Sequence, residues 1–253
     1  MYLAPVMSTK MRLLLTGPRN AAENMAIDEA ILLAGDVPTL RLYEWSPPAI
    51  TIGYFQSINE EVNLNECKKR GVDVVRRITG GGAVYHKHEI TYSVVLPEKL
   101  VPADILESYR VICGGIIYAL GALGINASFA GINDILVGGR KISGSAQTRK
   151  KGRVLQHGTL LLDVDVDEMF TLLRVPEEKM RDKIVKDVKK RVISIKQVLD
   201  NYRKDDVIDA LINGFCKALH MSAEEQNMSD TEAEMARRLA VEKYSSYEWN
   251  HMR

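Results

Sequence analysis

The sequence predicts an α+β protein, with a mixed β-sheet core packed by helices and a helical last third. Three observations lead to this class. Apolar and polar residues alternate in several short segments between residues 39 and 96, a pattern typical of strands. Gly138-Gly139 joins two apolar runs, as in a two-residue hairpin. From Val166 onward the apolar residues follow a helical period, so the order of elements differs from alternating βαβ winding.

Length and composition indicate an ordinary globular protein. The chain has 253 residues, of which 46% are apolar and 26% charged, and we expect one domain over residues 1–253, with a β-rich core at 11–165 and a helical portion at 166–253. A net charge of +1, from 34 Lys+Arg against 33 Asp+Glu, argues against non-specific nucleic-acid binding. We see no signal peptide and no apolar run of membrane-spanning length, which predicts a cytoplasmic location.

The first elements follow from local signals. Asn20 is a suitable N-cap for an amphipathic helix that ends at Gly35, since Asn accepts from the first free backbone N–H groups. The other expected elements before the glycine run are a strand at 11–17, a strand pair at 39–45 and 49–55 with Ser46-Pro47-Pro48 as its turn, a helix at 58–70 and a strand at 73–77.

The later elements are predicted in the same way. Two glycines that both accept positive φ place a tight hairpin at 134–143. We also expect strands at 83–86, 90–96 and 154–164, a long helix at 102–123, and helices within 167–175, 177–192, 205–221 and 229–244. The basic run 181–191 is typical of a solvated helix face, although it could also contact an acidic partner.

Residues 76–89, RRITGGGAVYHKHE, hold the most informative motif. The glycines match neither a P-loop nor the dinucleotide fingerprint. A backbone without side chains lets a ligand lie against its N–H groups, which suits a phosphate or a carbonyl oxygen. Arg76 and Arg77 enter at the same point and could pair with an anion. The alternative is a glycine bulge beside two solvent-facing arginines.

Lys141 and the pair Asn133-Asp134 flank the predicted hairpin. Small residues follow the lysine in KISGSAQ, so its ammonium could lie in a narrow groove and neutralise a phosphate or polarise a carboxyl group. Asp134 could bind Mg²⁺ beside a nucleotide, and Asn133 could contact a phosphate or base. An exposed hairpin lysine and ordinary turn chemistry are the alternatives.

Histidines and cysteines give no further catalytic signal. His86 and His88 share a strand face, and neither these two nor His157 has an acid partner recognisable by spacing; we interpret all three as hydrogen-bonding or packing residues. Cys67, Cys113 and Cys216 lie in helix-like segments without metal-ligand spacing, so neither a zinc site nor a nucleophilic thiol is indicated.

Taken together, the motifs resemble one family. RRITGGGAVYH, GINDILV, GRKISGSAQ and QHGTLLLDVD occur in the order and spacing of the lipoate–protein ligases, within the biotin/lipoyl protein ligase superfamily, and RLYEW, ITIGYFQ and YSSYEWN also fit. The resemblance covers residues 12–250. It implies a class II biotin/lipoyl ligase-like fold in the short form that lacks a C-terminal accessory domain.

The resemblance also implies an activity and a site. The enzyme would activate lipoate or octanoate with ATP and Mg²⁺ to an acyl-adenylate, then pass the acyl group to a lysine of a lipoyl carrier domain. Such carriers are the acyltransferase subunits of 2-oxoacid dehydrogenases and the glycine cleavage H protein. The implied catalytic residue is Lys141. The implied adenylate-binding residues are Arg77, Gly82, Ala83, Val84, Tyr85, Asn133, Asp134 (also the Mg²⁺ ligand) and Lys141, and the implied lipoyl-binding residues are Gly80, Gly81, Lys141, Gly144, Ser145 and His157.

Two rival functions remain open. Related octanoyltransferases take the acyl group from acyl-carrier protein and pass it through a cysteine thioester. The segment before the hairpin here has no cysteine, and Gly82 stands where those transferases tend to carry Arg, so we expect the ligase. A non-catalytic lipoyl- or nucleotide-binding module is the more remote alternative, and a biotin ligase fits poorly. A ligase of this short form could need a separate small accessory subunit.

Overall fold

The structure is a computed structural model that describes residues 9–175 and 180–253. Its larger sheet is mixed, because β1 is parallel to both of its neighbours while the other pairs are antiparallel. The strand order across this sheet is β11 (Met221–Glu225), β1 (Thr9–Arg19), β2 (Thr39–Trp45), β6 (Glu89–Pro97), β10 (Arg153–Leu161), β9 (Arg140–Lys150), β8 (Asp134–Val137) and β7 (Ala127–Ala130).

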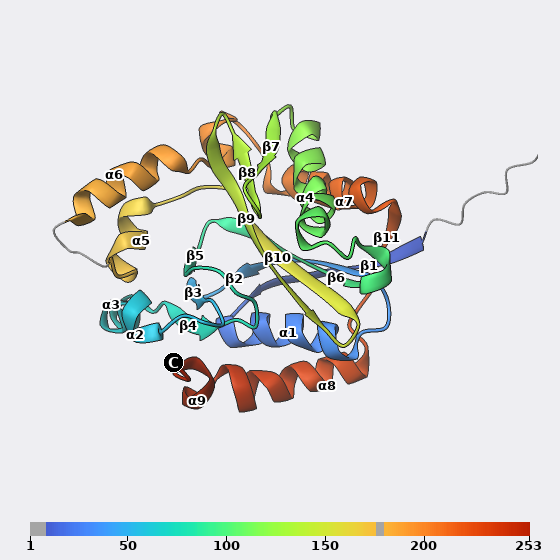
Figure 1. Cartoon of the computed structure of the whole chain (residues 1–253), viewed down its shortest axis with the longest axis horizontal. Coiled ribbons are helices and arrows are strands. Elements are labelled where there is room, and N and C mark those ends of the chain that lie inside the picture. Colours follow the sequence, from blue (N-terminus) through green and yellow to red (C-terminus); the bar gives the residue numbers. More distant parts are fainter. Residues whose placement is uncertain (1–8, 176–179) are drawn as a thin grey trace, which may run out of the picture.

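A second, smaller sheet lies beside the first. In it β3 (Ala49–Ile52) pairs in parallel with β4 (Asp73–Arg76) and antiparallel with β5 (Val84–His86). The short helices α2 (Ile58–Glu61) and α3 (Leu64–Arg70) lie near this sheet in Figure 1, and α5 (Val166–Leu172) packs against α3. Strand β5 leads directly into β6 of the larger sheet, so the two sheets are joined at this point.

Helices cover both faces of the larger sheet (Figure 1). On one face lie α4 (Ile105–Ala122) and α7 (Lys204–Leu219), which pack against each other. On the other lie α1 (Ala21–Ala34) and α8 (Asp230–Leu239), followed by a π-helical turn at Ala240–Tyr244 and by α9 (Tyr247–Asn250). Helix α6 (Arg181–Arg191) contains no buried residue, as expected of a solvated basic face.

Alternation along the strands builds a core on each side. In β6, Tyr92 and Val94 belong to the cluster under α4 and α7, whereas Val95 belongs to the cluster under α1 and α8. Asn20 caps α1 in a capping box with Glu23, as its position predicts. The class, a mixed sheet packed by helices, is confirmed.

Three details of the predicted elements are wrong. Strands β2 and β3 do not pair but lie in different sheets, because Pro47 and Pro48 lack the N–H groups that a ladder at the turn would need. The helix expected at 58–70 is interrupted between α2 and α3. The last third is not wholly helical, since Met221–Glu225 forms β11 beside β1. Part of the helix expected at 177–192 lies outside the described residues.

Helix α4 qualifies the statement that the sequence has no membrane-spanning run. Its 18 residues are long and apolar enough to cross a membrane by length and composition. Ile112, Cys113, Ile116 and Leu120 of this helix are fully buried in the core against the sheet and α7. A core helix passes the same test, and this packing accounts for its composition.

Candidate active site

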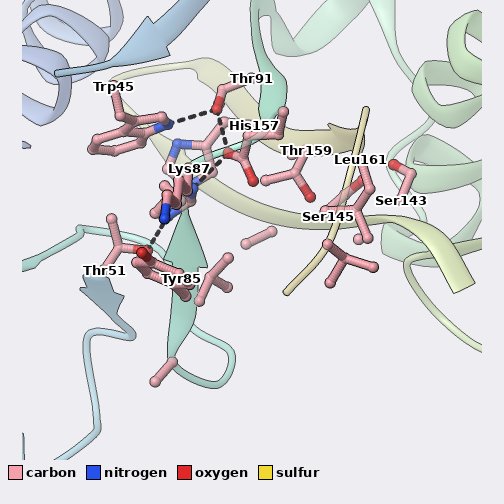
Figure 2. Close-up of a pocket in the computed structure, with 18 of the residues that line it drawn as sticks. Trp45, Thr51, Tyr85, Lys87, Thr91, Ser143, Ser145, His157, Thr159 and Leu161 are labelled. Atoms are coloured by element: carbon pink, nitrogen blue, oxygen red, sulfur yellow. Dashed lines mark hydrogen bonds and ion pairs between the residues drawn. The ribbon is translucent and has the colours of Figure 1, made fainter. Parts of the chain in front are cut away.

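A cavity of about 300 Å³ lies between the two sheets, on the α1 side of the larger sheet. Figure 2 shows side chains from β2, β3, β5, β6, β9 and β10 around it. Glycine backbone and apolar side chains form much of its wall, including Met25, Trp45, Val84, Leu161, Met169 and Val192. A mostly apolar cavity with a few polar groups is typical of a small-molecule site.

The glycine run forms one edge of this cavity, held by Arg77. The Arg77 Nη2 atom donates to the carbonyl oxygens of Gly80 and Gly82 at 2.7 and 2.8 Å. Gly81 has a φ of +98°, which only glycine adopts readily. A Cβ atom on Gly53 would lie 2.0 Å from the Gly81 oxygen, so two glycines allow this close approach. Arg77 therefore fixes the glycine run, Gly80–Gly82, as an edge of backbone without side chains, called the glycine ledge below.

Neither arginine of the motif faces solvent. Arg77 is 5% exposed and its other donors reach Thr51 and Thr79. Burial lowers the Arg77 pKa to about 10, so the side chain remains a cation at neutral pH. Arg76 is fully buried and donates to the carbonyl oxygens of Trp249 and Asn250, which ties α9 to β4. The reading of two solvent-facing arginines is thus contradicted.

Lys141 reaches the cavity because of a bulge in β9. Asp134 of β8 pairs with Gly144 of β9. Leu136, two residues further along β8, pairs with Lys141, which is three residues from Gly144 along β9. The extra residue is Ile142, and it puts Lys141 on the same face as Gly144 in spite of their odd spacing. A Cβ on Gly144 would lie 2.6 Å from Lys141 Cε, so the lysine lies across the glycine.

Asp134 fixes the end of this lysine. Its Oδ1 atom lies 2.7 Å from Lys141 Nζ, and the Lys141 side chain is 42% exposed. The Asn133 side chain donates to the Ser145 carbonyl oxygen and the Ser145 N–H donates to Asn133 O, which anchors the start of β8 to β9. The ammonium is therefore oriented but still accessible, as a group that stabilises developing negative charge requires.

His157 belongs to a buried chain of polar groups behind the ledge. Its Nδ1 lies 3.0 Å from Asp28 Oδ2 and its Nε2 lies 2.7 Å from Thr79 Oγ1. Asp28 also accepts from Arg41 at 2.8 Å and from the Tyr43 hydroxyl at 3.0 Å. Burial raises the Asp28 pKa, but the hydrogen bond from His157 and the charge of Arg41 outweigh it and leave that pKa below its usual range. Asp28 therefore stays ionised and holds the proton on Nδ1.

His86 is held in the same manner at the opposite wall. Its Nδ1 lies 2.6 Å from Glu89 Oε1, its Nε2 lies 2.9 Å from Thr51 Oγ1, and its ring stacks on Trp45 with centroids 4.1 Å apart. Thr91 links Glu89 to the Trp45 indole, as the dashed lines in Figure 2 show. Both histidines thus have acid partners that their spacing did not reveal, and both ring nitrogens of each are hydrogen-bonded, as their interpretation as hydrogen-bonding residues predicts.

The sequence could have revealed only one of these two acids. Glu89 follows His86 by three residues across the tight turn from β5 to β6, a spacing that a turn brings into contact. Asp28 is 129 residues from His157, and no local pattern joins them. The cavity residues Met25, Trp45, Thr51 and Met169 were also missed, because each comes from an element with an ordinary core pattern.

Most of the predicted site residues line the cavity. Those on its wall are Arg77, Gly81, Gly82, Ala83, Val84, Tyr85, Asn133, Lys141, Gly144, Ser145 and His157. Gly80 and Asp134 are not among the lining residues; they lie behind the wall, beside Arg77 and Lys141 respectively. The structure therefore brings the glycine ledge together with Lys141 and His157, which follow it by about 60 and about 75 residues in the sequence.

The residues present do not make a magnesium site by themselves. Among the residues that the structure describes, no group of three His, Cys, Asp or Glu side chains could hold a metal ion. The carboxylate expected to bind Mg²⁺, Asp134, is already paired with Lys141. A hard cation such as Mg²⁺ prefers several oxygen ligands. The expected site offers one carboxylate, that of Asp134, and it already pairs with Lys141.

Comparison with known proteins gives the family. Residues 20–216 match the lipoyl protein ligase A/B catalytic domain. The chain belongs to this family. The resemblance to lipoate–protein ligases and the expected fold are therefore confirmed, and the protein is an enzyme of the ligase and transferase class that serves protein lipoylation.

Solved structures in this family match nearly the whole chain. A bi-partite lipoate protein ligase from Thermoplasma acidophilum, studied with its E2 lipoyl domain, has a TM-score of 0.89 at 37% identity, covering 97% of this chain and 96% of that one. A lipoate-protein ligase A bound with ATP has a TM-score of 0.84 at 35% identity, covering 96% and 98%.

Curated relatives overturn the expected activity. The octanoyltransferase LipM of Symbiobacterium thermophilum is 38% identical over 96% of this chain and 99% of its own length, and that of Kyrpidia tusciae is 39% identical over 95% and 98%. Relatives from Halalkalibacterium halodurans and Bacillus subtilis bear the same name. The ATP-dependent lipoate ligase is thus the wrong reading, and the octanoyltransferase alternative fits better. The two features that favoured the ligase, Gly82 and a segment before the hairpin without a cysteine, therefore did not predict which relatives the chain resembles.

Proposed function

We propose that the protein is an octanoyltransferase, which moves an octanoyl group from a carrier-protein thioester to a lysine of a lipoyl carrier domain. The observation that carries this proposal is the name shared by full-length relatives at 38% and 39% identity. The apolar cavity suits a medium-length acyl chain, since burial of each CH₂ group contributes about 0.8 kcal/mol. The polar groups of its wall suit the thioester end.

Most of the predicted site residues have a role in the proposed reaction. Lys141 polarises the thioester carbonyl and stabilises the oxyanion that forms on attack. Asp134 is a positioning residue for that ammonium, at 2.7 Å. Gly81, Gly144, Ser145 and His157 line the acyl chain. Arg77 holds the backbone of the glycine ledge by hydrogen bonds, and Gly82 and Val84 line the cavity there. The proposed reaction uses no nucleotide, so ATP, Mg²⁺ and the adenylate contacts of Asn133 and Asp134 have no part in it.

The proposed acceptors are the lipoyl domains of 2-oxoacid dehydrogenase acyltransferase subunits and the glycine cleavage H protein. A neighbouring ligase was studied with an E2 lipoyl domain, which supports this class of partner. We propose a cytoplasmic location for this activity. An accessory subunit, expected for an adenylating enzyme of short form, is not required by a thioester donor.

The test compares three mixtures, each with a lipoyl carrier domain whose intact mass is read. The first contains octanoyl-acyl-carrier protein without ATP, the second octanoate with ATP and Mg²⁺, and the third lipoate with ATP and Mg²⁺. We expect octanoylation in the first mixture at a rate well above the other two. Modification that occurs only in the ATP-containing mixtures would refute the proposal.

A further inference from the structure

The motif YSSYEWN, residues 244–250, lies near the C-terminus and contributes no residue to the cavity wall among those that the structure describes. We propose that Trp249 and Asn250 are positioning residues for acyl transfer, which act on the glycine ledge through Arg76. The inference rests on the proposed transferase function. It adds to the site a segment of the chain that touches neither the acyl group nor a carrier domain.

Arg76 divides its donors between the C-terminal segment and the loop at residues 53–56, called the 53–56 loop below. Its Nε and Nη2 atoms donate to the carbonyl oxygens of Trp249 and Asn250, at 3.0 and 2.9 Å. Its Nη1 atom donates to three carbonyl oxygens of the 53–56 loop, those of Gly53, Tyr54 and Gln56, at 3.1, 2.9 and 2.6 Å. The side chain is fully buried, and a buried cation needs an acceptor for each of its donors. One guanidinium group therefore fixes the two segments relative to each other.

The C-terminal segment is itself anchored at two places. Trp249 Nε1 donates to Arg76 O at 2.9 Å, and the Arg76 N–H donates to Asn250 Oδ1 at 2.7 Å. Asn250 Nδ2 donates to Tyr244 O at 2.9 Å, and the Tyr244 hydroxyl donates to the buried Glu29 of α1 at 2.7 Å. In Figure 1 the C-terminus and α9 lie beside β4. The segment thus joins α1 to the end of β4.

The 53–56 loop carries this restraint to the glycine ledge. The Tyr54 N–H donates to Thr79 O at 2.9 Å, directly before the ledge. A Cβ on Gly53 would lie 2.0 Å from Gly81 O, so the two backbones are in contact and the ledge follows any shift of the loop. Arg77, the residue after Arg76, holds the ledge itself. Two successive arginines therefore fix the ledge and the loop on which it rests.

The expected effect on the reaction follows from the position of the ledge. The ledge and Lys141 both line the cavity, so the reacting carbonyl needs both in place. A displacement of about 1 Å, caused by a change far from the reacting atoms, can slow a reaction by ~100-fold. Loss of the C-terminal contacts should therefore lower kcat and leave the KM for the carrier domain unchanged. A merely structural role would lower stability but not the kcat of the folded protein.

Three variants test the inference, each assayed with octanoyl-acyl-carrier protein and a lipoyl domain at a temperature where unfolding curves show it to be folded. Asn250→Ala removes the acceptor of the Arg76 N–H, and we expect kcat to fall by ~10-fold or more, with KM for the lipoyl domain within about twofold of wild type. Asn250→Asp keeps that acceptor and should recover most of the loss. Trp249→Phe keeps a ring but loses the bond to Arg76 O, and kcat should fall by ~5-fold.

Tyr247→Ala is the matched control, because Tyr247 lies on the same short helix and is 69% exposed. It should leave kcat and KM unchanged. Trp249→Phe also supplies the answer if Asn250→Ala does not fold. Wild-type kcat in folded Trp249→Phe and Asn250→Ala proteins, or an equal loss of kcat in Tyr247→Ala, would overturn the inference but leave the transferase function intact. Absence of transfer even in the wild type would overturn the proposed function and this inference with it.

Discussion

Lys141 owes its position to the residues around it rather than to its own chemistry. The bulge at Ile142 turns it toward the cavity, Gly144 leaves the room in which its side chain lies, and Asp134 holds its ammonium. Its motif, KISGSAQ, predicts a lysine beside small residues. The bulge was not predictable, because one extra residue in a strand has no mark in the sequence. The motif thus predicts a lysine beside small residues, but only the backbone explains why its side chain lies at the cavity.

The first prediction concerns this lysine. We expect Lys141→Ala to slow octanoyl transfer by ~10²–10³-fold, the scale of removing one preorganised donor to an oxyanion. Asp134→Asn should slow it less, because the ammonium remains but loses its anchor. The measurement is kcat/KM from the mass of the carrier domain, with folding checked by circular dichroism.

Lys183→Ala is the matched control for these variants. Lys183 is an exposed lysine on α6, and its loss should leave the transfer rate unchanged. Wild-type activity in folded Lys141→Ala protein would disprove the role of the ammonium. If Asp134→Asn were as damaging as Lys141→Ala, Asp134 would have a function beyond positioning.

A second prediction separates the glycines of the ledge. Gly81 has a φ of +98°, and a Cβ on it would lie 2.9 Å from Arg77 Nη2, whereas a Cβ on Gly80 would meet no atom within 4 Å. Gly81→Ala should therefore lower the free energy of unfolding by about 1–3 kcal/mol. Gly80→Ala should change it by less than about 1 kcal/mol. Urea unfolding of both variants checks this, and equal effects would mean that the ledge has no strained position.

At the scale of elements, two buried ion pairs fasten helices to the larger sheet. Asp28 of α1 pairs with Arg41 of β2 at 2.8 Å. Glu232 of α8 accepts from Arg12 of β1 through both carboxylate oxygens. Burial alone would raise the pKa of Glu232, but its hydrogen bonds with Arg12 outweigh this effect and lower the pKa below its usual range. The pKa of Asp28 is also lowered, in that case by His157 and Arg41. Both carboxylates are therefore ionised in the folded protein at neutral pH, and their protonation would weaken the docking of these helices.

A third prediction follows for acid stability. Because both folded-state pKa values lie below the ordinary values of 3.8 and 4.5, the stabilisation is fully present above these values and is lost as pH falls through the folded-state pKa values. Glu232→Gln should reduce stability at pH 7 by an amount on the order of 3 kcal/mol. It should also flatten the fall of stability below pH ~4.5.

The matched control is Glu234→Gln, on the exposed side of the same helix. It should leave both the stability at pH 7 and its acid dependence close to wild type. Urea unfolding midpoints from pH 7 to pH 3 provide the comparison. A Glu232→Gln variant with the same acid dependence as wild type would show that this pair does not control acid unfolding.

The same scale explains which elements the sequence could predict. The hairpin at Gly138-Gly139 is confirmed, with φ values of 55° and 77°, because its signal is contained in two adjacent residues. Strand β11 was missed because its segment, MSAEE, lacks an apolar alternation and is a strand only through pairing with β1. The expected pairing of β2 with β3 is also wrong: Pro47 and Pro48 disfavour a ladder at that turn, and β2 instead pairs with β1 and β6, which lie far from it in the sequence.

Across the whole molecule, the cavity exists because two sheets meet. The smaller sheet supplies Thr51, Tyr85 and His86, and the larger supplies Lys141 and His157. The motifs placed the protein in its family, because their order and spacing extend over most of the chain. They did not separate a ligase from a transferase, since one family model covers both the A and the B type of catalytic domain. That distinction depends on the donor, which local patterns do not encode.

The decisive experiment is to read the intact mass of a lipoyl carrier domain after incubation with this protein and an octanoyl thioester, in buffer freed of nucleotides. We expect one octanoyl group on the acceptor lysine, formed at a rate that Lys141→Ala reduces by at least ~100-fold. A carrier domain that stays unmodified there, and gains its acyl group only when a free acid and ATP are supplied, would contradict it.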